Sequence, residues 1–570
     1  MMKKCISTIL LLALLISSVA ILSSCKLKTN DLGVIPLEYY DQTGPEGYSN
    51  LFYRNDLLLT AADPCCIYVT EGEYEGWFFL YASSDELSCN GYQCWKSKDL
   101  TSWEYEGICF MPDKNSWSRQ DLWAPEVIYD EEYGKYILVY NGTNTNQEDG
   151  YVKTHYIGMA YSDSPAGPFI QYTGTNQNGT EIGIGDPIFD IELLGHDHPL
   201  YKRGTGFIDA HPFIDPVTGD RYLYFVRTRN VHTTNIVVGV KMIDWATPDY
   251  STYHELVTVN RTTYNGDVIT EKTEGTINEA PNVLYHNGKY YLTLSVNGAS
   301  DKDYGVIQAI SDSPLGPYEK IQASEGGLVN GADVIWDHVS CVGSHSFVQA
   351  GDEFWTVYHQ NRDRDAGGTM NRGIACDRVV WTKNDDGIDV LKAIGPTYSP
   401  QPKPAVFTGY KNVASLASIS ATNALAETSV DYLNDGIVKL HDPDNSTKEF
   451  DGSGLVTITM SFDEYVTAKA LLIYNSAFYE NAFYQVNRID LSFRKEIDGE
   501  EYTGVARVEN LYYDFEAYSQ IDYEIMRPGA PLILEFDELE VNEITIYINC
   551  PPEQEYVSVS EIMVLGKEVE

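Results

Sequence analysis

The chain has 570 residues, of which 43% are hydrophobic, and a formal net charge of −44 at pH 7. A chain of this length exceeds one hydrophobic core, so two domains are expected. The negative charge excludes nucleic acid and other polyanions as partners, because phosphate backbones are bound by Lys and Arg side chains. The 43 Tyr and 9 Trp residues are a heavy aromatic load, which favours β-sheet.

Residues 1–25 have the pattern of an export signal. Two lysines precede an apolar run over residues 6–22, and small residues stand directly before Cys25. This pattern resembles the bacterial lipobox, so we expect Cys25 to be acylated and to anchor the protein on the outside of the membrane. The alternative is an uncleaved membrane helix, for which the apolar run is near the short limit. Residues 26–45 are polar, contain Gly and Pro, and predict a tether.

One sequence pattern recurs five times between residues 46 and 395. It consists of a Pro or small residue, two or three apolar residues, a short polar turn with Gly, and an aromatic-rich strand. Hydrophobic alternation and turn chemistry make each copy a β-hairpin. The copies begin near Ala62, Ala124, His211, Glu279 and His345.

The spacing of the copies predicts a β-propeller. They start about 60 to 90 residues apart, which allows roughly four strands per repeat, the size of one propeller blade with long loops. A second duplication supports a repeat fold, because the segment 161–169 nearly recurs as 310–318. We expect each of these segments to close a strand and turn to the next blade. The sequence therefore predicts an all-β fold, with a five-bladed propeller over residues 46–395.

A second domain is expected after the propeller. Residues 396–409 are punctuated by Pro and predict a linker. Residues 410–570 contain no Trp and many alternating strands, which indicates a β-sandwich. The pattern resembles a discoidin-like, galactose-binding-type jelly roll. Either a sugar-binding or a spacer role fits it.

Three acids lie just upstream of the apolar strand in their repeats: Asp63, Asp209 and Glu279. Radial repetition brings equivalent strand ends together at one axis, so we expect the three to converge at the inner rim of one funnel. Carboxyl groups that lie so near one another raise each other's pKa. One of them then serves as an acid and another as a base, although the groups are chemically similar. Glycosidic cleavage requires that pairing.

The residues around these acids resemble glycoside hydrolase family 43. The resemblance covers residues 46–395 and departs from the family at Glu126, where the family often has Asp, and at Ser344, where it usually has His. The motifs that carry it are Asp63-Pro64, Trp123-Ala124-Pro125-Glu126, the segment Ile208 to Phe213, Glu279-Ala280-Pro281, the segment Gly343 to Phe347, and Tyr358-His359 with Arg372.

The resemblance implies an inverting hydrolase that cleaves arabinofuranosyl or xylosyl linkages of plant cell-wall polysaccharides or oligosaccharides. It implies that Asp63 is the general base, that Glu279 is the general acid, and that Asp209 tunes the pKa of the acid. Inversion needs room for a water molecule, so the base and acid carboxyl groups are expected about 6.5 to 9.5 Å apart.

The resemblance also implies further site residues. Trp123, Arg372 and His211 are expected to bind substrate, although an ion pair with Asp377 would equally explain Arg372. No cofactor is needed for the chemistry. Family members often anchor a calcium ion or a water cluster in the propeller channel through a His, and His345 is the candidate for that role here.

Two other functions fit parts of the pattern. A catalytically silent, sugar-binding surface lipoprotein is disfavoured by the complete set of Asp63, Asp209 and Glu279. A retaining fructan or sucrose hydrolase is disfavoured because the Asn-Asp-Pro-Asn signature of those propellers is absent around Asp63. Fold likeness does not separate these functions, whereas the site does.

Overall fold

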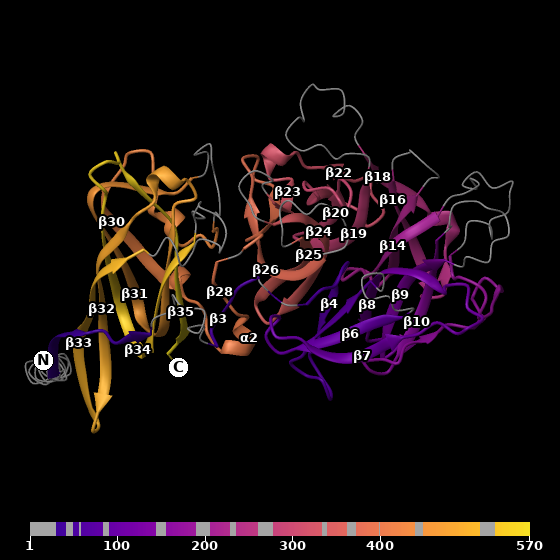
Figure 1. Cartoon of the computed structure of the whole chain (residues 1–570), viewed down its shortest axis with the longest axis horizontal. Helices are drawn as coiled ribbons and strands as arrows, with labels where there is room; N and C mark the ends of the chain where they lie inside the picture. Colours follow the sequence, from indigo (N-terminus) through magenta and orange to yellow (C-terminus); the bar gives the residue numbers. More distant parts are fainter. Residues whose placement is uncertain are drawn as a thin grey trace, which may run out of the picture.

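The computed structural model consists mainly of β-strands with very little helix, arranged in two parts that lie side by side (Figure 1). A propeller forms the larger part and a single curled sheet forms the smaller one. The described residues are 30–40, 50–83 without 56 and 58, 91–143, 155–189, 206–228, 235–259, 277–332, 339–361, 372–438 without 398, 448–513 and 530–569.

The larger part is a five-bladed β-propeller, which confirms the predicted fold class. Each blade is an antiparallel sheet of four or five strands. Blade 1 contains β4 (Cys65–Tyr68), β5 (Phe78–Ala82), β6 (Tyr92–Ser97) and β7 (Glu104–Phe110). Blade 2 contains β8 (Gln120–Asp130), β9 (Lys135–Thr143), β10 (Tyr156–Ser162) and β11 (Ile170–Gln171). Blade 3 contains β14 (Gly206–Ile214), β15 (Arg221–Thr228), β16 (Ile236–Asp244), β17 (Thr247–Pro248) and β18 (His254–Thr258). Blade 4 contains β19 (Asn278–His286), β20 (Lys289–Val296), β21 (Gly305–Ser311), β22 (Glu319–Lys320) and β23 (Leu328–Gly331). Blade 5 contains β24 (Ser340–Ala350), β25 (Glu353–Asn361), β26 (Arg372–Lys383) and β27 (Asp389–Ala393).

Apolar side chains fill the spaces between neighbouring blades. Separate buried clusters lie between blades 1 and 2, 2 and 3, 3 and 4, 4 and 5, and 5 and 1. The ring is closed by a short segment before blade 1, where Thr60 bridges to Gly373 of β26 and the Ala61 N–H donates to the Arg372 carbonyl. Blade 5, late in the chain, is thereby packed against blade 1.

The duplicated segments occupy equivalent places, but they do not lead from one blade to the next. Residues 161–169 connect β10 to β11, and residues 310–318 connect β21 to β22. In both cases the turn joins the third strand of a blade to the fourth strand of that same blade. The prediction that each turn leads to the next blade is therefore wrong, while the repeat that it indicated is present.

The smaller part is a nine-stranded sheet around one apolar core. Its long strands β31 and β34 pair with each other along most of their length, so the strands form one hydrogen-bonded sheet. The jelly-roll and discoidin-like interpretation stays a prediction. The strands in sheet order are β1 (Asn30–Pro36), β33 (Glu500–Tyr512), β32 (Gln485–Ile497), β34 (Pro531–Asn549), β31 (Phe450–Asn475), β35 (Val557–Glu568) and β29 (Lys411–Asn412), with β2 (Tyr39–Tyr40) on β34 and β30 (Ala417–Ala424) on β31.

Part of the predicted tether belongs to this sheet. β1 pairs in parallel with β33, and β2 pairs with β34, so residues 30–40 belong to the second domain although they precede the first. Sequence periodicity did not reveal β1 because most of its side chains are exposed and no apolar face is needed. Residues 26–29 and 41–45 of the predicted tether lie outside the described residues, as does the predicted signal with Cys25.

The predicted linker is also structured. β28 (Gln401–Pro402) pairs with β3 (Phe52–Tyr53), and the short helix α2 (Ala405–Thr408) follows it (Figure 1). A buried cluster joins the two parts, with Phe52 and Ile394 from the propeller side and Tyr474 and Met563 from the sheet. Within the described residues, no helix has the length and hydropathy needed to cross a membrane.

Candidate active site

The first strand of every blade carries a residue with a positive φ at an equivalent place, at or just before the strand; β8 and β24 each carry a second such residue three positions earlier, Asp121 and Cys341. Non-glycine residues adopt this conformation uncommonly. Its recurrence at five equivalent places therefore indicates that the propeller fold itself requires it. In blades 2 to 5 it coincides with an irregularity in the pairing of the first two strands, as in a β-bulge. The five residues are Asp63 (φ 49°), Ala124 (φ 41°), Asp209 (φ 55°), Ala280 (φ 48°) and Ser344 (φ 46°).

The three acids do not occupy one equivalent position, contrary to the prediction. Asp63 and Asp209 are themselves the positive-φ residues of blades 1 and 3, whereas Glu279 comes one residue before Ala280 in blade 4. The counterpart of Glu279 in blade 2 is Trp123, and in blade 5 it is Gly343. The Ala-Pro pairs at 124–125 and 280–281 show this correspondence in the sequence, because Trp123 and Glu279 each stand directly before such a pair.

Asp63 is surrounded by groups that favour its ionised form. Its Oδ1 lies 3.3 Å from Arg372 Nη1 and 3.4 Å from His359 Nδ1, and its Oδ2 accepts a hydrogen bond of 2.5 Å from Ser83 Oγ. Burial raises the pKa of Asp63, but the charge of Arg372, the adjacent His359 ring and the hydrogen bond from Ser83 outweigh burial and hold the pKa well below its usual range. The side chain is thus a carboxylate at neutral pH.

Asp209 is surrounded by groups whose combined effect raises its pKa. Its Oδ2 accepts a hydrogen bond of 3.0 Å from the Ala280 N–H, which ties blade 3 to the residue beside Glu279. Burial raises the pKa of Asp209, and the negative charge of Asp63 raises it further.

Glu279 is also held above its usual pKa. Burial has the largest effect, the charge of Asp209 adds to it, and together they raise the pKa of Glu279 to about 8. The Tyr304 hydroxyl donates to Glu279 Oε1 at 3.0 Å and partly opposes the shift. The three acids therefore interact electrostatically, as their predicted convergence requires, and they divide into one low-pKa and two raised-pKa groups.

Neighbouring blades are joined by hydrogen bonds from the backbone N–H of the positive-φ residues. In four of the five blades the acceptor is a polar side chain at one position of the second strand, or directly after it, in the preceding blade: Ser83 for Ala124, Asn141 for Asp209, Ser295 for Ser344 and His359 for Asp63. The cross-strand register places Val226 at this position in blade 3. Valine cannot accept a hydrogen bond, and there the Asp209 carboxylate takes the Ala280 N–H instead. Asp209 is thus a structural link as well as a charge.

Two of the predicted substrate-binding residues lie with the acids. Arg372 is 3% exposed and pairs with Asp63; Asp377 accepts hydrogen bonds from Tyr358 and Thr397 instead, so the predicted alternative ion pair with Arg372 is not formed. Trp123 occupies the position of blade 2 that corresponds to Glu279, and its ring lies 4.5 Å from that of His155.

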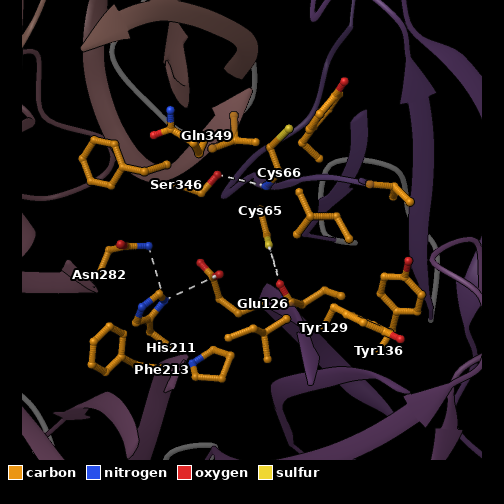
Figure 2. A pocket seen from close by; sticks show the side chains of 18 of the residues that line it. Cys65, Cys66, Glu126, Tyr129, Tyr136, His211, Phe213, Asn282, Ser346 and Gln349 are labelled. Carbon is orange, nitrogen blue, oxygen red and sulfur yellow. Dashed lines mark hydrogen bonds and ion pairs between the residues drawn. The ribbon is translucent and has the colours of Figure 1, made fainter. Parts of the chain in front are cut away.

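The third predicted substrate-binding residue, His211, lies in the propeller channel. Its Nδ1 is 3.7 Å from Glu126 Oε2 and 3.3 Å from Asn282 Nδ2. Figure 2 shows Glu126, His211 and Asn282 directed toward one another in a cavity of about 410 Å³. Cys65 and Ser346 complete the polar part of that lining, so each blade supplies the residue two positions after its positive-φ residue.

The predicted metal ligand His345 does not belong to this lining. It is buried, its Nε2 lies 2.7 Å from Thr293 Oγ1, and burial with the charge of His211 lowers its pKa to about 3. Among the described residues, no three His, Cys, Asp or Glu side chains are grouped as metal ligands. The calcium ion stays a prediction, and the side-chain oxygens that the channel offers to it include the Glu126 carboxylate.

A family model described as glycosyl hydrolases family 43 matches residues 57–387, which is more than half of the chain. The chain belongs to this family. It is therefore a glycosidase, and the resemblance seen around the three acids is confirmed. A curated relative, the β-D-galactofuranosidase xynD of Aspergillus niger, is 25% identical over 320 residues, or 54% of this chain and 76% of the relative.

Several solved structures are similar to this glycosidase. A thermostable family 43 glycoside hydrolase has 28% identity and a TM-score of 0.48, and the match covers 62% of this chain and 99% of the other. An endo-1,4-β-xylanase from Bacteroides thetaiotaomicron has 25% identity and a TM-score of 0.45, with 60% and 97% of the two chains covered.

Two residues of this family 43 site were not found by sequence reasoning. Ser83 could have been found from the hairpin register, since continuing that register two residues beyond Cys65 and Tyr81 sets Ser83, directly after β5, opposite Asp63. Tyr304 had no such signal, because it precedes the third strand of blade 4 and belongs to none of the repeated hairpins. The site as a whole can hold one carboxylate and one carboxylic acid at the same pH, which is the requirement for paired proton transfer.

Proposed function

We propose that the chain is an inverting glycosidase that cleaves arabinofuranosyl or xylosyl linkages of plant cell-wall polysaccharides or oligosaccharides. Asp63 is the general base, Glu279 is the general acid, and Asp209 keeps the acid protonated. The observation that carries the proposal is the opposite shift of two pKa values at one site, with that of Asp63 lowered and that of Glu279 raised.

Each side chain has a defined task in the reaction. The Asp63 carboxylate takes a proton from a water molecule while the oxygen of that water molecule attacks the anomeric carbon. Glu279 gives its proton to the glycosidic oxygen as the bond from that oxygen to the anomeric carbon breaks. Arg372 stabilises Asp63 in the ionised form before each turnover. The negative charge of Asp209 opposes early loss of the Glu279 proton.

The choice of sugar rests on the motif resemblance and on the curated relative. That relative is a galactofuranosidase, and arabinofuranose is likewise a five-membered ring. The test is hydrolysis of nitrophenyl α-L-arabinofuranoside, β-D-xyloside and β-D-galactofuranoside, together with linear arabinan. Cleavage of the galactofuranoside but of neither pentoside would replace the pentose assignment.

The stereochemical outcome is tested by NMR of the first product formed. Inversion places the new hydroxyl on the opposite face of the sugar. Retention would show that Asp63 is a nucleophile instead of a base. Catalytic silence on every substrate, with sugar binding intact, would favour the surface-binding lipoprotein.

We also propose that Cys25 is lipidated and holds the protein at the membrane surface. β1 begins at Asn30, so only residues 26–29 would separate the anchor from the curled sheet, a reach of about 14 Å. β1 lies on the side of that sheet away from the propeller (Figure 1). The second domain would then stand between membrane and catalytic site. Cell fractionation of wild type and Cys25→Ala tests this, and equal amounts of both in the soluble fraction would contradict it.

A further inference from the structure

Tyr304 is a buried tyrosine whose hydroxyl contacts the proposed general acid. It precedes β21 in blade 4, is 1% exposed, and donates its hydroxyl hydrogen to Glu279 Oε1 at 3.0 Å. Buried polar groups that touch a reacting carboxyl group either hold it in place or alter its protonation.

The direction of this hydrogen bond follows from the groups behind it. The Ser344 N–H donates to Ser295 Oγ at 2.9 Å, so that oxygen acts as an acceptor and its own hydrogen is free to be donated. The Ser295 hydroxyl lowers the pKa of Tyr304, which is the effect of a hydroxyl that points its hydrogen toward the Tyr304 oxygen. With that side of the oxygen facing a donor, the single hydrogen of Tyr304 is directed to Glu279 Oε1.

The ring of Tyr304 is fixed by two neighbouring residues. It stacks on the His359 ring, with a centroid distance of 5.7 Å and an interplanar angle of 8°. His359 Nδ1 accepts the Asp63 N–H at 3.2 Å, so the stack reaches from the acid to the backbone of the base. Gly343, which pairs with His359 across β24 and β25, is the second residue against the ring, because a methyl group there would overlap it. Glycine at this position of blade 5 leaves the space that the ring fills.

We propose that Tyr304 is a positioning residue that keeps Oε1 of Glu279 as a hydrogen-bond acceptor and thereby places the acidic proton on Oε2, toward the leaving group. The proposal rests on the role of Glu279 as general acid. In the reaction, the Oε2–H bond breaks, the glycosidic oxygen gains the proton, and the electrons of the broken carbon–oxygen bond remain on that oxygen. Glu279 becomes a carboxylate, and the hydrogen bond from Tyr304 strengthens as the charge develops.

The test variant is Tyr304→Phe, which keeps the ring and removes only the hydroxyl. Loss of a hydrogen bond that strengthens in the transition state should lower kcat about 10- to 100-fold on methyl glycosides, with KM changed little. On 2,4-dinitrophenyl glycosides, whose leaving group needs no proton, the loss should be much smaller. Tyr291→Phe is the matched control, because Tyr291 in the same blade also donates its hydroxyl in a buried setting, to the Asp389 carbonyl.

The pH profile gives a second readout. The charged groups that act on Glu279 are Asp209 and Asp63, which raise its pKa, and Arg372, which lowers it; the hydrogen bond from Tyr304 also lowers it. Removing the hydroxyl should therefore move the alkaline limb of the profile to higher pH, whereas Tyr291→Phe should not move it.

Two results would overturn the proposal. The first is an equal loss of kcat on methyl and dinitrophenyl glycosides, which would make Tyr304 a structural residue only. The second is an unchanged alkaline limb. If Tyr304→Phe does not fold, Ser295→Ala is measured in its place and must show the same dependence on leaving group in weaker form. Failure of the general-acid assignment itself is recognised separately, because Glu279→Gln would then show no dependence on leaving group.

Discussion

Blades 1 and 4 share a positive-φ residue at the first strand, but the acids that they carry there have opposite pKa shifts. Blade 1 carries Asp63 on the positive-φ residue, and blade 4 carries Glu279 one residue before it. The packing partner differs as well: blade 5 brings Arg372 and His359 to Asp63, whereas blade 3 brings Asp209 to Glu279. The difference shows that the repeat places the acids, while the neighbouring blade sets their protonation.

The circular order of the blades makes this division possible. Asp63 and Arg372 are 309 residues apart, yet closure of the ring sets blade 5 against blade 1. A linear stack of repeats would leave Asp63 at one end without that partner. The fold thus supplies a cation on one side of the site and a carboxylate on the other.

Replacing the base should have the largest effect, because no other group can take its place. Asp63→Asn should lower kcat by about 10²- to 10⁴-fold or more on every substrate, including those with activated leaving groups. The exposed Asp163→Asn, which loses only an ion pair with Lys135, should leave kcat unchanged. Substantial activity in Asp63→Asn would show that blade 1 does not supply the general base.

Replacing the acid should cause a large loss that depends on the substrate. Glu279→Gln should lower kcat by about 10²- to 10⁴-fold on methyl glycosides, which need a proton on the leaving oxygen. On 2,4-dinitrophenyl glycosides the loss should be far smaller, because that leaving group departs as an anion. A uniform loss on both substrates would mean that blade 4 does not supply the acid. Circular dichroism and thermal melting of each variant separate loss of chemistry from loss of fold.

The parts of this site that are local in sequence could be predicted. Asp63, Asp209 and Glu279 stand beside repeated hairpin motifs, so repetition was enough to indicate the blades and the acids. The partners of the acids could not be predicted, because Arg372 reaches Asp63 only through ring closure, and Tyr304 lies outside every hairpin. β1 was missed for another reason: it is mostly exposed and leaves no periodic apolar signal. His211 lies among the channel residues, and its predicted contact with substrate stays a prediction.

Removing the charge of Asp209 should weaken the contrast in protonation between Asp63 and Glu279. The negative charge of Asp209 raises the pKa of Glu279, so Asp209→Asn should lower that pKa. Glu279 would then lose its proton at a lower pH, and the alkaline limb of the kcat/KM profile would move down from its wild-type place. The pKa of Asp63 is already well below its usual range, so the acidic limb should move little. An alkaline limb that stays in place would show that Asp209 acts only as the link to the Ala280 N–H.

The smallest effect is expected from two serines at equivalent positions. Ser83 and Ser295 each accept the N–H of the positive-φ residue in the next blade, that of Ala124 and of Ser344. Replacing either with Ala leaves one backbone N–H without its acceptor, so both variants should lose about 1 to 3 kcal/mol of stability, measured by denaturant unfolding.

Only Ser83 also donates to Asp63, and the two variants should differ there. In Ser83→Ala the carboxylate loses one of the hydrogen bonds that favour its ionised form, so its pKa should rise and the acidic limb of kcat/KM should move to higher pH. Arg372 and His359 remain, so the loss of activity near neutral pH should be about 10-fold or less. In Ser295→Ala the acidic limb should stay in place, because Ser295 acts on the Tyr304 side of the site. Equal movement of the acidic limb in both variants would mean that the shift comes from loosened contacts between blades and not from the hydrogen bond to the base.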